Sequence, residues 1–447
     1  MKRKYFFGTD GVRGCANKPP ITAETTLKLG ISAGHYFNSA SGSKRVIIGK
    51  DTRRSGYMLE NALTAGLTAV GMNVFFLGPV PTPAVGILTK SMRADVGIMI
   101  SASHNPFSDN GIKFFGPDGF KLSEADELKI ENLMSQELPL APAKDIGRAR
   151  RINDGLGRYT EAVKTTLPSS FSLEGFKIVI DCANGASYKA APEILWELGA
   201  DVVEIGTKPD GYNINFNCGS VYPEKAASEV LRTGADLGIC LDGDADRVVL
   251  IDEKGRIANG DQLMAVIATH WQESGRLRGK GVVSTVMSNL GFEKYLNSKG
   301  LNLKRTPVGD RHVIAAMRKG NFNLGGEQSG HVILSDFMST GDGLVAGLQF
   351  LASILDKKSA ASKLLNTFKP YPQVVKSIQG TNLPGLLKRK PVISTMKEVE
   401  MMLGSEGRLF IRQSGTEPVI RVMVEHYNQG LVSEVVEMMS EALVESK

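Results

Sequence analysis

The sequence has few cysteines, and their spacing does not suit a shared metal or a redox pair. Its four cysteines, Cys15, Cys182, Cys218 and Cys240, include no C-x-x-C pair. Zinc sites and disulfide frameworks need closely spaced or paired cysteines. We therefore exclude both kinds of site and expect buried thiols in a reducing compartment.

Long hydrophobic runs and blocks of one charge are also lacking. No apolar run approaches the roughly 18 residues that a membrane span requires, and the apolar stretch 5–7 is too short for the core of a signal peptide. The 53 basic and 47 acidic residues are scattered, with no basic block or aromatic-interleaved stripe. We therefore expect a cytoplasmic protein with no membrane and no nucleic-acid partner. A net charge of +6 is compatible with an anionic small substrate.

The common nucleotide-binding motifs are absent as well. Residues 8–14 are rich in glycine, but they lack the G-x-G-x-x-G spacing of a dinucleotide site, and no Walker A sequence occurs. An ATP-dependent kinase is therefore disfavoured. The remaining functional interpretation of this loop is a backbone turn that presents Thr9 and Arg13 to an anion.

Apolar runs alternate with amphipathic stretches along the 447 residues. Such alternation is typical of α/β architecture, and the length predicts two to four domains. We expect strands at residues 46–48, 74–77, 96–100, 178–180, 237–241, 248–251 and 282–286. We expect helices at residues 23–38, 57–70, 124–135, 224–233, 261–273 and 430–445.

A similar order of strand, small polar loop and helix begins at three places, residues 44–56, 176–187 and 280–291. This pattern suggests three similar α/β units, although ordinary βα connections produce it too. Polar or proline-containing stretches without periodicity indicate the boundaries. We expect domains at 1–150, 151–252, 253–368 and 369–447. The last has its own strand–loop–strand–helix pattern, typical of a small α+β domain.

The sequence Ser-Ala-Ser-His-Asn-Pro at residues 101–106 follows the apolar run 96–100. We expect that run to be a buried strand of a parallel sheet, and ligands bind beyond the carboxyl ends of such strands. Adjacent side chains diverge on a strand or a helix, so a direct pair of Ser103 with His104 is poor geometry. Asn105 precedes Pro106 and favours a loop. We expect Ser103 on an exposed turn, either as a covalent carrier or only as a turn cap.

Three aspartates, Asp242, Asp244 and Asp246, lie between two apolar runs and precede Arg247. Such closely spaced carboxylates repel one another unless a cation lies among them, and ligand sets made only of oxygen select Mg²⁺ or Ca²⁺. An EF-hand is excluded because Arg247 stands where that loop needs glycine. The alternative is a solvated acidic turn.

A polar loop near the C-terminus, residues 412–418, has the composition of a phosphate cradle. Gly415 lets backbone N–H groups turn toward a ligand, and Ser414 and Thr416 add hydroxyl donors. Arg412 and Arg421 supply planar guanidinium groups that suit phosphate. A hairpin turn with surface arginines is the alternative.

Three further segments carry candidate polar groups. Glu327 and Ser329 stand where they can accept from and donate to sugar hydroxyls, and His331 is a candidate proton shuttle. Lys113 follows the turn Asn-Gly and is expected close to Ser103. A glycine turn also presents Asp310, Arg311 and His312; alone, each of these segments can equally be structural.

Taken together, residues 8–14, 101–106, 242–247, 326–331 and 412–418 resemble the α-D-phosphohexomutases, in the family's order and over nearly the whole chain. Residues 49–56 and 79–83 fit the same pattern. At position 328 this sequence resembles the bacterial members that act on glucosamine phosphates, which have glutamine there. The enzymes that act on mannose and glucose phosphates usually have methionine at this position. One departure is the stretch 218–224, where relatives typically have Thr-His before Pro-Glu.

The resemblance implies four domains around a central cleft: three similar α/β units with mixed sheets and a smaller C-terminal α+β domain. It implies an isomerase that interconverts glucosamine 6-phosphate and glucosamine 1-phosphate for UDP-N-acetylglucosamine and cell-wall precursors. A phosphoserine at Ser103 and a sugar 1,6-bisphosphate, as intermediate and activator, belong to that reaction. One Mg²⁺ per chain would be bound by Ser103 and by Asp242, Asp244 and Asp246.

The resemblance also assigns the remaining candidates. Arg247 would lie beside the phosphoserine, and Lys113, Arg13 and His331 are the acid–base candidates. The proposed substrate-binding residues are Thr9, Asp310, Arg311, His312, Glu327, Ser329, Arg412, Ser414, Gly415, Thr416 and Arg421.

Three alternatives stay open: a phosphomannomutase/phosphoglucomutase activity, a metal-dependent sugar phosphatase and a non-catalytic sugar-phosphate sensor. The sequence does not decide the oligomeric state, and a homodimer is one alternative.

Overall fold

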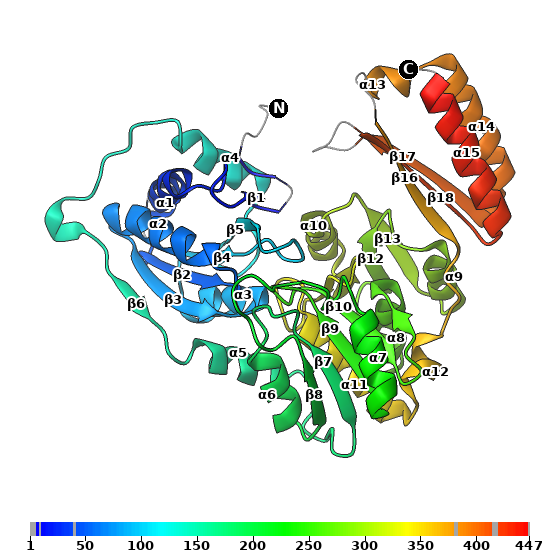
Figure 1. Cartoon of the computed structure of the whole chain (residues 1–447), viewed down its shortest axis with the longest axis horizontal. Helices are drawn as coiled ribbons and strands as arrows, with labels where there is room; N and C mark the ends of the chain where they lie inside the picture. Colours follow the sequence, from blue (N-terminus) through cyan, green and yellow to red (C-terminus); the bar gives the residue numbers. More distant parts are fainter. Residues whose placement is uncertain (1–5, 9, 39–41, 380–382, 414–418, 446–447) are drawn as a thin grey trace. The chain divides into compact units, whose positions relative to one another are not determined.

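The computed structural model describes the chain except residues 1–5, 9, 39–41, 380–382, 414–418 and 446–447 (Figure 1). The chain divides into two compact units. The first comprises Met1–Val286 with Leu303–Asn366, and the second comprises Met287–Asn302 with Thr367–Lys447. Three sheets belong to the first unit and one to the second.

The first sheet is mixed and has the strand order β1-β5-β4-β2-β3-β6. Strand β2 pairs in parallel with β3 and β4, and β5 runs antiparallel to β4 and β1. The parallel sheet expected around residues 96–100 is therefore a mixed one. The strands are β1 (Val12–Cys15), β2 (Arg45–Lys50), β3 (Asn73–Pro79), β4 (Val96–Ile100), β5 (Asp109–Phe115) and β6 (Ala149–Arg151).

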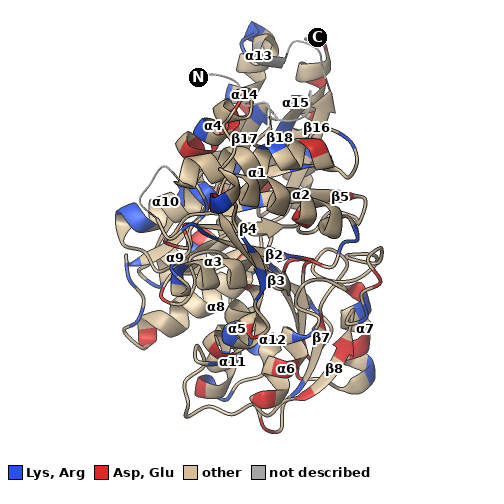
Figure 2. Cartoon of the chain, turned by 90° about the vertical axis from the view of Figure 1, so that its left-hand side faces the viewer, with Lys and Arg blue, Asp and Glu red and all other residues tan. Residues whose placement is uncertain are grey.

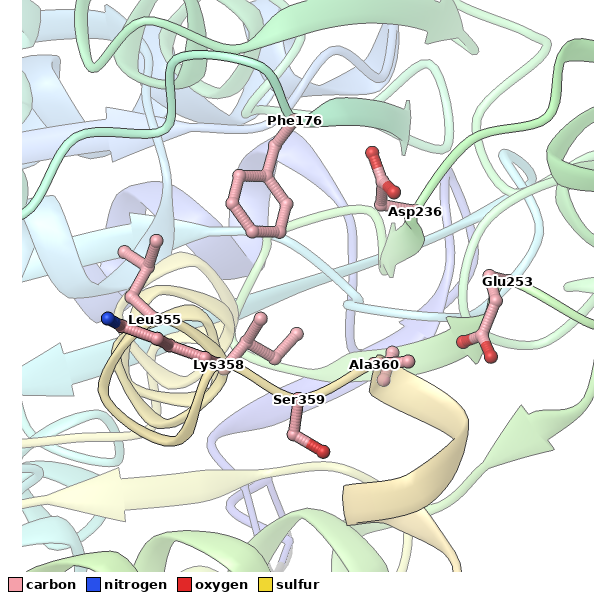
Figure 3. A pocket seen from close by; sticks show the side chains of 9 residues that line it. Phe176, Asp236, Glu253, Leu355, Lys358, Ser359 and Ala360 are labelled. Atoms are coloured by element: carbon pink, nitrogen blue, oxygen red, sulfur yellow. The ribbon is translucent and has the colours of Figure 1, made fainter.

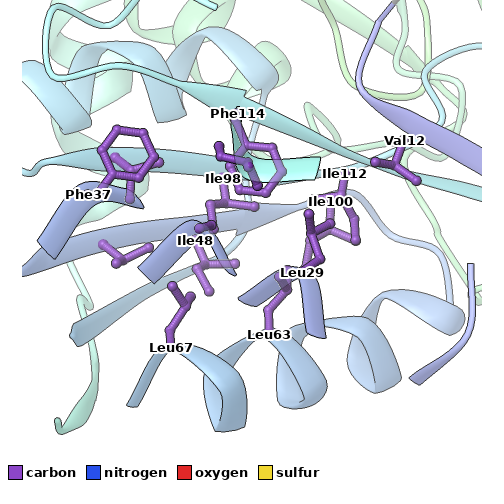
Figure 4. Close-up of a cluster of buried hydrophobic side chains, with 14 of the residues drawn as sticks. Val12, Leu29, Phe37, Ile48, Leu63, Leu67, Ile98, Ile100, Ile112 and Phe114 are labelled. Atoms are coloured by element: carbon purple, nitrogen blue, oxygen red, sulfur yellow. The ribbon is translucent and has the colours of Figure 1, made fainter. Parts of the chain in front are cut away.

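Alternation along the strands sends side chains to two faces of this sheet. Ile48, Ile98 and Ile100 pack in one apolar cluster with Leu29 of α1 and Leu63 of α2 (Figure 4). On the other face the glycines of β2 and β4 lie against α3. The helices are α1 (Ala23–Asn38), α2 (Ser55–Ala69), α3 (Thr82–Ser91) and α4 (Glu124–Leu133).

The second and third sheets repeat the α/β pattern. The second has the order β11-β10-β9-β7-β8, with β7 (Lys177–Asp181) parallel to β8 (Asp201–Ile205) and β9 (Leu237–Leu241). It also contains β10 (Val248–Asp252) and β11 (Ile257–Ala258), and the chain between 155 and 233 adds α5 (Gly155–Lys164), α6 (Ala190–Glu197) and α7 (Glu224–Thr233).

The third sheet has the order β13-β12-β14-β15. Its strands are β12 (Gly281–Thr285), β13 (Asn302–Thr306), β14 (Leu324–Gly326) and β15 (Val332–Leu334). The accompanying helices are α8 (Gly260–Glu273), α10 (Asp310–Gly320), α11 (Gly343–Lys357) and α12 (Ala361–Leu365).

The second unit is built on an antiparallel sheet of order β16-β18-β17, with bounds Gln373–Gln379, Val419–His426 and Gly407–Gln413. Helices α13 (Leu383–Leu386), α14 (Lys390–Leu403) and α15 (Gln429–Glu445) complete its α+β pattern. Helix α9 (Leu290–Ser298) also belongs to this unit. The buried carboxylate of Glu425 fixes it there, because its Oε1 accepts the Leu290 N–H at 2.7 Å.

The expected fold class is confirmed: three mixed α/β sheets are followed by a smaller antiparallel sheet with helices. The exact domain boundaries stay a prediction. Helix α9 lies within the expected domain 253–368 but packs with the C-terminal strands. Basic and acidic residues are interleaved along the ribbon (Figure 2). Across the described parts of the chain, no helix combines the length and apolar character needed to span a membrane.

Candidate active site

Ser103 lies in the loop that joins β4 to β5, and its side chain is buried rather than exposed. The residue is 1% exposed and has a left-handed backbone, with φ of +52°. Its hydroxyl donates to Asp242 Oδ2 at 2.5 Å. The expectation of an exposed turn is therefore wrong: Asn215 and Gly243, both far away in sequence, cover the loop.

His104 is closer to Ser103 than the rule for neighbouring side chains predicts. Its Nδ1 lies 3.4 Å from Ser103 Oγ. The rule applies to strands and helices, and the left-handed backbone at Ser103 is neither. Burial lowers the pKa of His104 to about 4, and the cations Arg247 and Arg13 add to this effect. His104 is therefore a neutral imidazole at pH 7.

The aspartate triplet occupies the tight turn between β9 and β10. All three side chains are buried, and one oxygen from each lies within 4.8 Å of the others. Burial, with the negative charges of Asp244 and Asp246, raises the pKa of Asp242 to about 8. The Oδ1 atoms of Asp244 and Asp246 are buried without a hydrogen-bond partner. An all-oxygen set with spare acceptors and mutual repulsion fits a hard cation such as Mg²⁺.

Helix α3 holds one of these carboxylates from its first turn. Thr82 Oγ1 donates to Asp244 Oδ2 at 2.6 Å, and the Thr82 N–H donates to the Asp244 carbonyl at 2.9 Å. The sequence Pro-Val-Pro-Thr-Pro at 79–83 drew attention to this segment but gave Thr82 no role. Such partners orient metal ligands and tune their affinity.

Lys113, on β5, faces the aspartate turn and is almost fully buried. Its Nζ lies 2.8 Å from Asp244 Oδ2, 3.3 Å from Asp246 Oδ2 and 3.4 Å from Asp10 Oδ2. Burial alone would lower the pKa of Lys113, but Asp10 and the two aspartates outweigh burial and raise it. Lys113 is therefore held as an ammonium group beside the Ser103 loop.

A chain of charges continues from Lys113 through Asp10 to the third sheet. Lys121 Nζ lies 2.5 Å from Asp10 Oδ1 and 2.5 Å from Asp310 Oδ2. His331 Nε2 is 3.6 Å from Asp310 Oδ2, and its Nδ1 is 3.5 Å from Asp246 Oδ1. Burial opposes protonation of His331, but Asp246 and Asp310 raise its pKa. Opposite charges thus alternate around a closed ring.

Lys121 is the member of this ring that the sequence did not indicate. It follows the turn at 116–119, where a lysine is indistinguishable from a surface residue. The glycine loop contributes Asp10, and Arg13 forms an ion pair with Asp10. Arg13 also donates to the Ala102 carbonyl at 3.5 Å, beside Ser103.

The candidates of the third sheet lie near this ring. Glu327 Oε1 accepts the Gly309 N–H at 3.1 Å, and Ser329 Oγ donates to Glu327 Oε2 at 3.4 Å. Arg311 donates to Glu127 of α4 at 2.7 Å, so its guanidinium already binds a carboxylate. His312 is exposed on the first turn of α10.

Arg247, the cation of the aspartate turn, is anchored through its backbone. Its N–H donates to Asp242 Oδ1 at 3.2 Å. Its side-chain Nε is buried and has no hydrogen-bond partner among the described residues. Asp246 and Asp242 raise its pKa against the effect of burial. Arg247 is therefore a cation of the aspartate turn, and its Nε lies 3.9 Å from Asp246 Oδ1 without making a hydrogen bond.

The phosphate-cradle candidates belong to the second unit. Arg412 and Arg421 are directly opposite each other on β17 and β18. Like charges in this arrangement are destabilising, and an anion between them would remove the cost. Burial and the charge of Arg421 lower the pKa of Arg412. The predicted residues Ser414, Gly415 and Thr416, like Thr9 in the first unit, lie outside the described residues.

A separate cavity of about 490 Å³ lies away from these groups (Figure 3). Phe176, Asp236 and Glu253 line one side, and residues 354–355 and 358–361 line the other. Glu253 is engaged by Ser362, whose N–H and hydroxyl both donate to it. No predicted site residue lines this cavity, so it does not belong to the candidate active site.

Comparison with known proteins identifies relatives over the whole chain. In sequence order, four domain profiles of the phosphoglucomutase/phosphomannomutase family match residues 4–140, 157–255, 259–371 and 369–442. The first three are described as alpha/beta/alpha domains I, II and III, and the fourth as the C-terminal domain. A phosphoglucosamine mutase from Cereibacter sphaeroides is 60% identical, and one from Paracoccus denitrificans is 58% identical. Both alignments cover 98% of this chain and 98% of the relative.

Solved structures share the fold. A phosphoglucomutase/phosphomannomutase family protein from Burkholderia thailandensis superposes with a TM-score of 0.81 at 24% identity, over 98% of this chain and 97% of that chain. The Aspergillus fumigatus N-acetylphosphoglucosamine mutase in complex with GlcNAc-6P and magnesium gives a TM-score of 0.66 at 17% identity, over 99% and 96%. With four matching domain profiles and full-length relatives near 60% identity, this chain belongs to the phosphoglucomutase/phosphomannomutase family, the phosphohexomutases.

Proposed function

We propose that the chain is a mutase that interconverts glucosamine 6-phosphate and glucosamine 1-phosphate and carries the phosphate on Ser103. Family membership makes it a phosphohexomutase, and the relatives at 58–60% identity are phosphoglucosamine mutases. The observation that carries the proposal is the position of Ser103. Its hydroxyl is 2.5 Å from Asp242, in a cluster of three buried carboxylates, with the Lys113 ammonium beside that cluster.

One Mg²⁺ would be bound by Asp242, Asp244 and Asp246, with an oxygen on Ser103 as a further ligand. When bound, it supplies positive charge for the phosphoryl oxygens during transfer. The residues present support this assignment, because Asp244 Oδ1 is buried without a hydrogen-bond partner, and burial together with the two neighbouring aspartates raises the pKa of Asp242.

Phosphoryl transfer then takes place in two half-reactions. In the first, the bond from phosphorus to the Ser103 oxygen breaks as sugar O1 bonds to that phosphorus. O1 loses its proton to the protein, the released Ser103 oxygen takes a proton to become a hydroxyl, and glucosamine 1,6-bisphosphate forms. The bisphosphate turns end for end. In the second half, the Ser103 hydroxyl loses its proton and takes the 6-phosphoryl group, while O6 leaves with a proton. The products are glucosamine 1-phosphate and phosphoserine.

The cations around Ser103 suit these steps. Arg247 has a buried Nε–H without a partner and would donate to the phosphoserine oxygens. The candidates for proton transfer at the sugar oxygens are Lys113, Arg13 and His331. Of these, Lys113 and His331 both contact Asp246, so loss of a proton from one favours the protonated form of the other.

Sugar recognition is assigned to the loop that contains Glu327 and Ser329. The Glu327 carboxylate would attract the ammonium group of glucosamine, which glucose and mannose lack. Asp310, Arg311 and His312 at the start of α10 complete this part of the site. Thr9 of the glycine loop is a further candidate for a contact to the substrate.

The phosphate that is not being transferred would be bound by the fourth domain, through Arg412, Ser414, Gly415, Thr416 and Arg421. A separate cradle of this kind can bind either end of the sugar in turn. The opposed arginines on β17 and β18 support the assignment, because an anion would relieve their repulsion.

The test compares mutase rates on glucosamine, glucose and mannose 6-phosphates, with catalytic glucose 1,6-bisphosphate and Mg²⁺. We expect a clear preference for glucosamine 6-phosphate. A preference for a neutral sugar would contradict the substrate, and free phosphate released at the rate of substrate loss would instead indicate a phosphatase. Glu327→Gln should reduce the preference for the amino sugar and leave turnover of glucose 6-phosphate less affected.

A further inference from the structure

Backbone carbonyls of the Ser103 loop accept hydrogen bonds from side chains that belong to two different sheets. The carbonyl oxygens of Ser103 and Asn105 each accept two side-chain donors, one from Arg53 and one from Asn215. Arg53 follows β2 of the first sheet, and Asn215 lies between β8 and α7 of the second. The left-handed backbone of Ser103 is therefore fixed from both sides.

The donor that comes from the first sheet, Arg53, is fully buried. Arg53 Nη2 lies 3.1 Å from the Ser103 carbonyl and 2.5 Å from the Asn105 carbonyl. Asp51 anchors it, since one Asp51 oxygen accepts from Arg53 Nη1 and also accepts the Ser101 hydroxyl at 2.6 Å. Ser101 Oγ in turn accepts the Ser103 N–H at 2.9 Å.

The donor that comes from the second sheet is the side-chain amide of Asn215. Asn215 Nδ2 lies 2.9 Å from the Ser103 carbonyl and 2.9 Å from the Asn105 carbonyl. Both partners can only accept, so the amide nitrogen must face them. Asn215 is 6% exposed, and its N–H donates to the Ala183 carbonyl at 2.9 Å.

The aspartate turn is packed against the same carbonyl. A Cβ at Gly243 would lie 2.6 Å from the Ser103 carbonyl oxygen and 2.8 Å from Asn215 Nδ2. The peptide between Asp242 and Asp244 is therefore in direct contact with the backbone of Ser103. Asn215 lies at this junction and binds the loop that carries Ser103 to the sheet that carries the aspartates.

We propose that Asn215 is a positioning residue for phosphoryl transfer, which keeps the Ser103 oxygen against the aspartate cluster whether or not it carries phosphate. The inference rests on the proposed function. The Ser103 hydroxyl proton tethers the unmodified residue to Asp242, but phosphorylation removes that proton. The bonds of Asn215 go to backbone carbonyls and survive the change. A left-handed backbone is unfavourable for serine, so without this donor the loop relaxes and the oxygen moves.

The experiment uses Asn215→Asp in the full-length protein, which keeps the size of the side chain and its tolerance of the left-handed backbone but removes the donor. Asn217→Asp is the matched control, because Asn217 is exposed, lies in the same loop and also has a left-handed backbone. Both proteins are phosphorylated with glucose 1,6-bisphosphate and mixed with glucosamine 6-phosphate. The measured quantities are the rate of phosphate loss from Ser103, the steady-state kcat and KM, and the thermal unfolding midpoint.

We expect Asn215→Asp to slow transfer and kcat by about 10–100-fold, the cost of a misplaced reacting atom. KM should stay within about twofold of the control, and the unfolding midpoint should fall but stay above the assay temperature, because two buried carbonyls lose a donor. A wild-type rate would overturn the proposal, as would a rise in KM with a parallel loss of thermal stability. If Asn215→Asp does not fold, Asn215→Gly decides, since glycine accepts this backbone and also lacks the donor. Absence of phosphate transfer in the wild type would refute the proposed function itself.

Discussion

Replacing Lys113 by methionine should destabilise the metal-free protein and make its stability depend more strongly on Mg²⁺. Lys113 is 1% exposed, and its ammonium compensates carboxylates of Asp10, Asp244 and Asp246. At the 2.8 Å separation from Asp244, the gross attraction is about 6 kcal/mol for an effective dielectric constant of about 20. Removing one partner of such a buried pair costs about 3–5 kcal/mol net, because the remaining charges lose their compensation.

The assay is urea unfolding of both proteins with EDTA and with saturating Mg²⁺. In the variant Asp244 has lost the cation that lies 2.8 Å from it, so Mg²⁺ should recover more stability than in the wild type. At a hundredfold excess over Kd, binding contributes about 2.7 kcal/mol. Lys129→Met is the control, because Lys129 lies 3.4 Å from Asp126 on the surface and is 62% exposed; such pairs contribute about 0–1 kcal/mol. If Lys113→Met costs no more stability than this control, or if Mg²⁺ stabilises both proteins equally, Lys113 does not compensate the aspartates.

Two further predictions concern the metal site. Thr82→Val removes the donor to Asp244 and should weaken Mg²⁺ binding, measured by calorimetry, by about 10–100-fold. Thr89→Val on the same helix is the control and should not weaken binding, because the Thr89 hydroxyl donates to the Val85 carbonyl. Equal Mg²⁺ affinities for the two variants would contradict this prediction. The pKa of Asp242, raised to about 8, predicts that Mg²⁺ affinity falls as pH decreases below 8, since a proton must leave. Because this folded-state pKa exceeds the unfolded value, the contribution of Asp242 to the stability of the metal-free protein should be lost as pH rises from about 4 toward 8, so wild type and Asp242→Asn should differ in the pH dependence of their unfolding. An affinity for Mg²⁺ independent of pH would show that Asp242 is already ionised.

Local patterns predicted the elements of the fold well. The expected helix 23–38 coincides with α1, and the strands 96–100 and 237–241 coincide with β4 and β9. Periodicity is a property of neighbouring residues, so it can be read along the chain. Helix α9 shows the limit, because its attachment to the C-terminal strands depends on Glu425, more than a hundred residues away.

The candidate site was predictable where its chemistry is concentrated in one segment. The aspartate triplet stood out because three carboxylates share one turn. Lys121 and Thr82 were missed because each is a single polar residue whose meaning comes only from distant partners, Asp310 and Asp244. The burial of Ser103 was missed for the same reason, since the residues that cover it lie beyond position 200.

In the proposed mechanism, Ser103 carries the phosphate that moves between the two ends of the sugar. The most direct measurement is mass spectrometry of the peptide that contains residues 101–106, before and after incubation with glucosamine 6-phosphate. We expect one phosphate on Ser103 that is lost to the sugar, and neither phosphate nor mutase turnover in Ser103→Ala. Phosphate retained on Ser101, or unchanged turnover in Ser103→Ala, would contradict it.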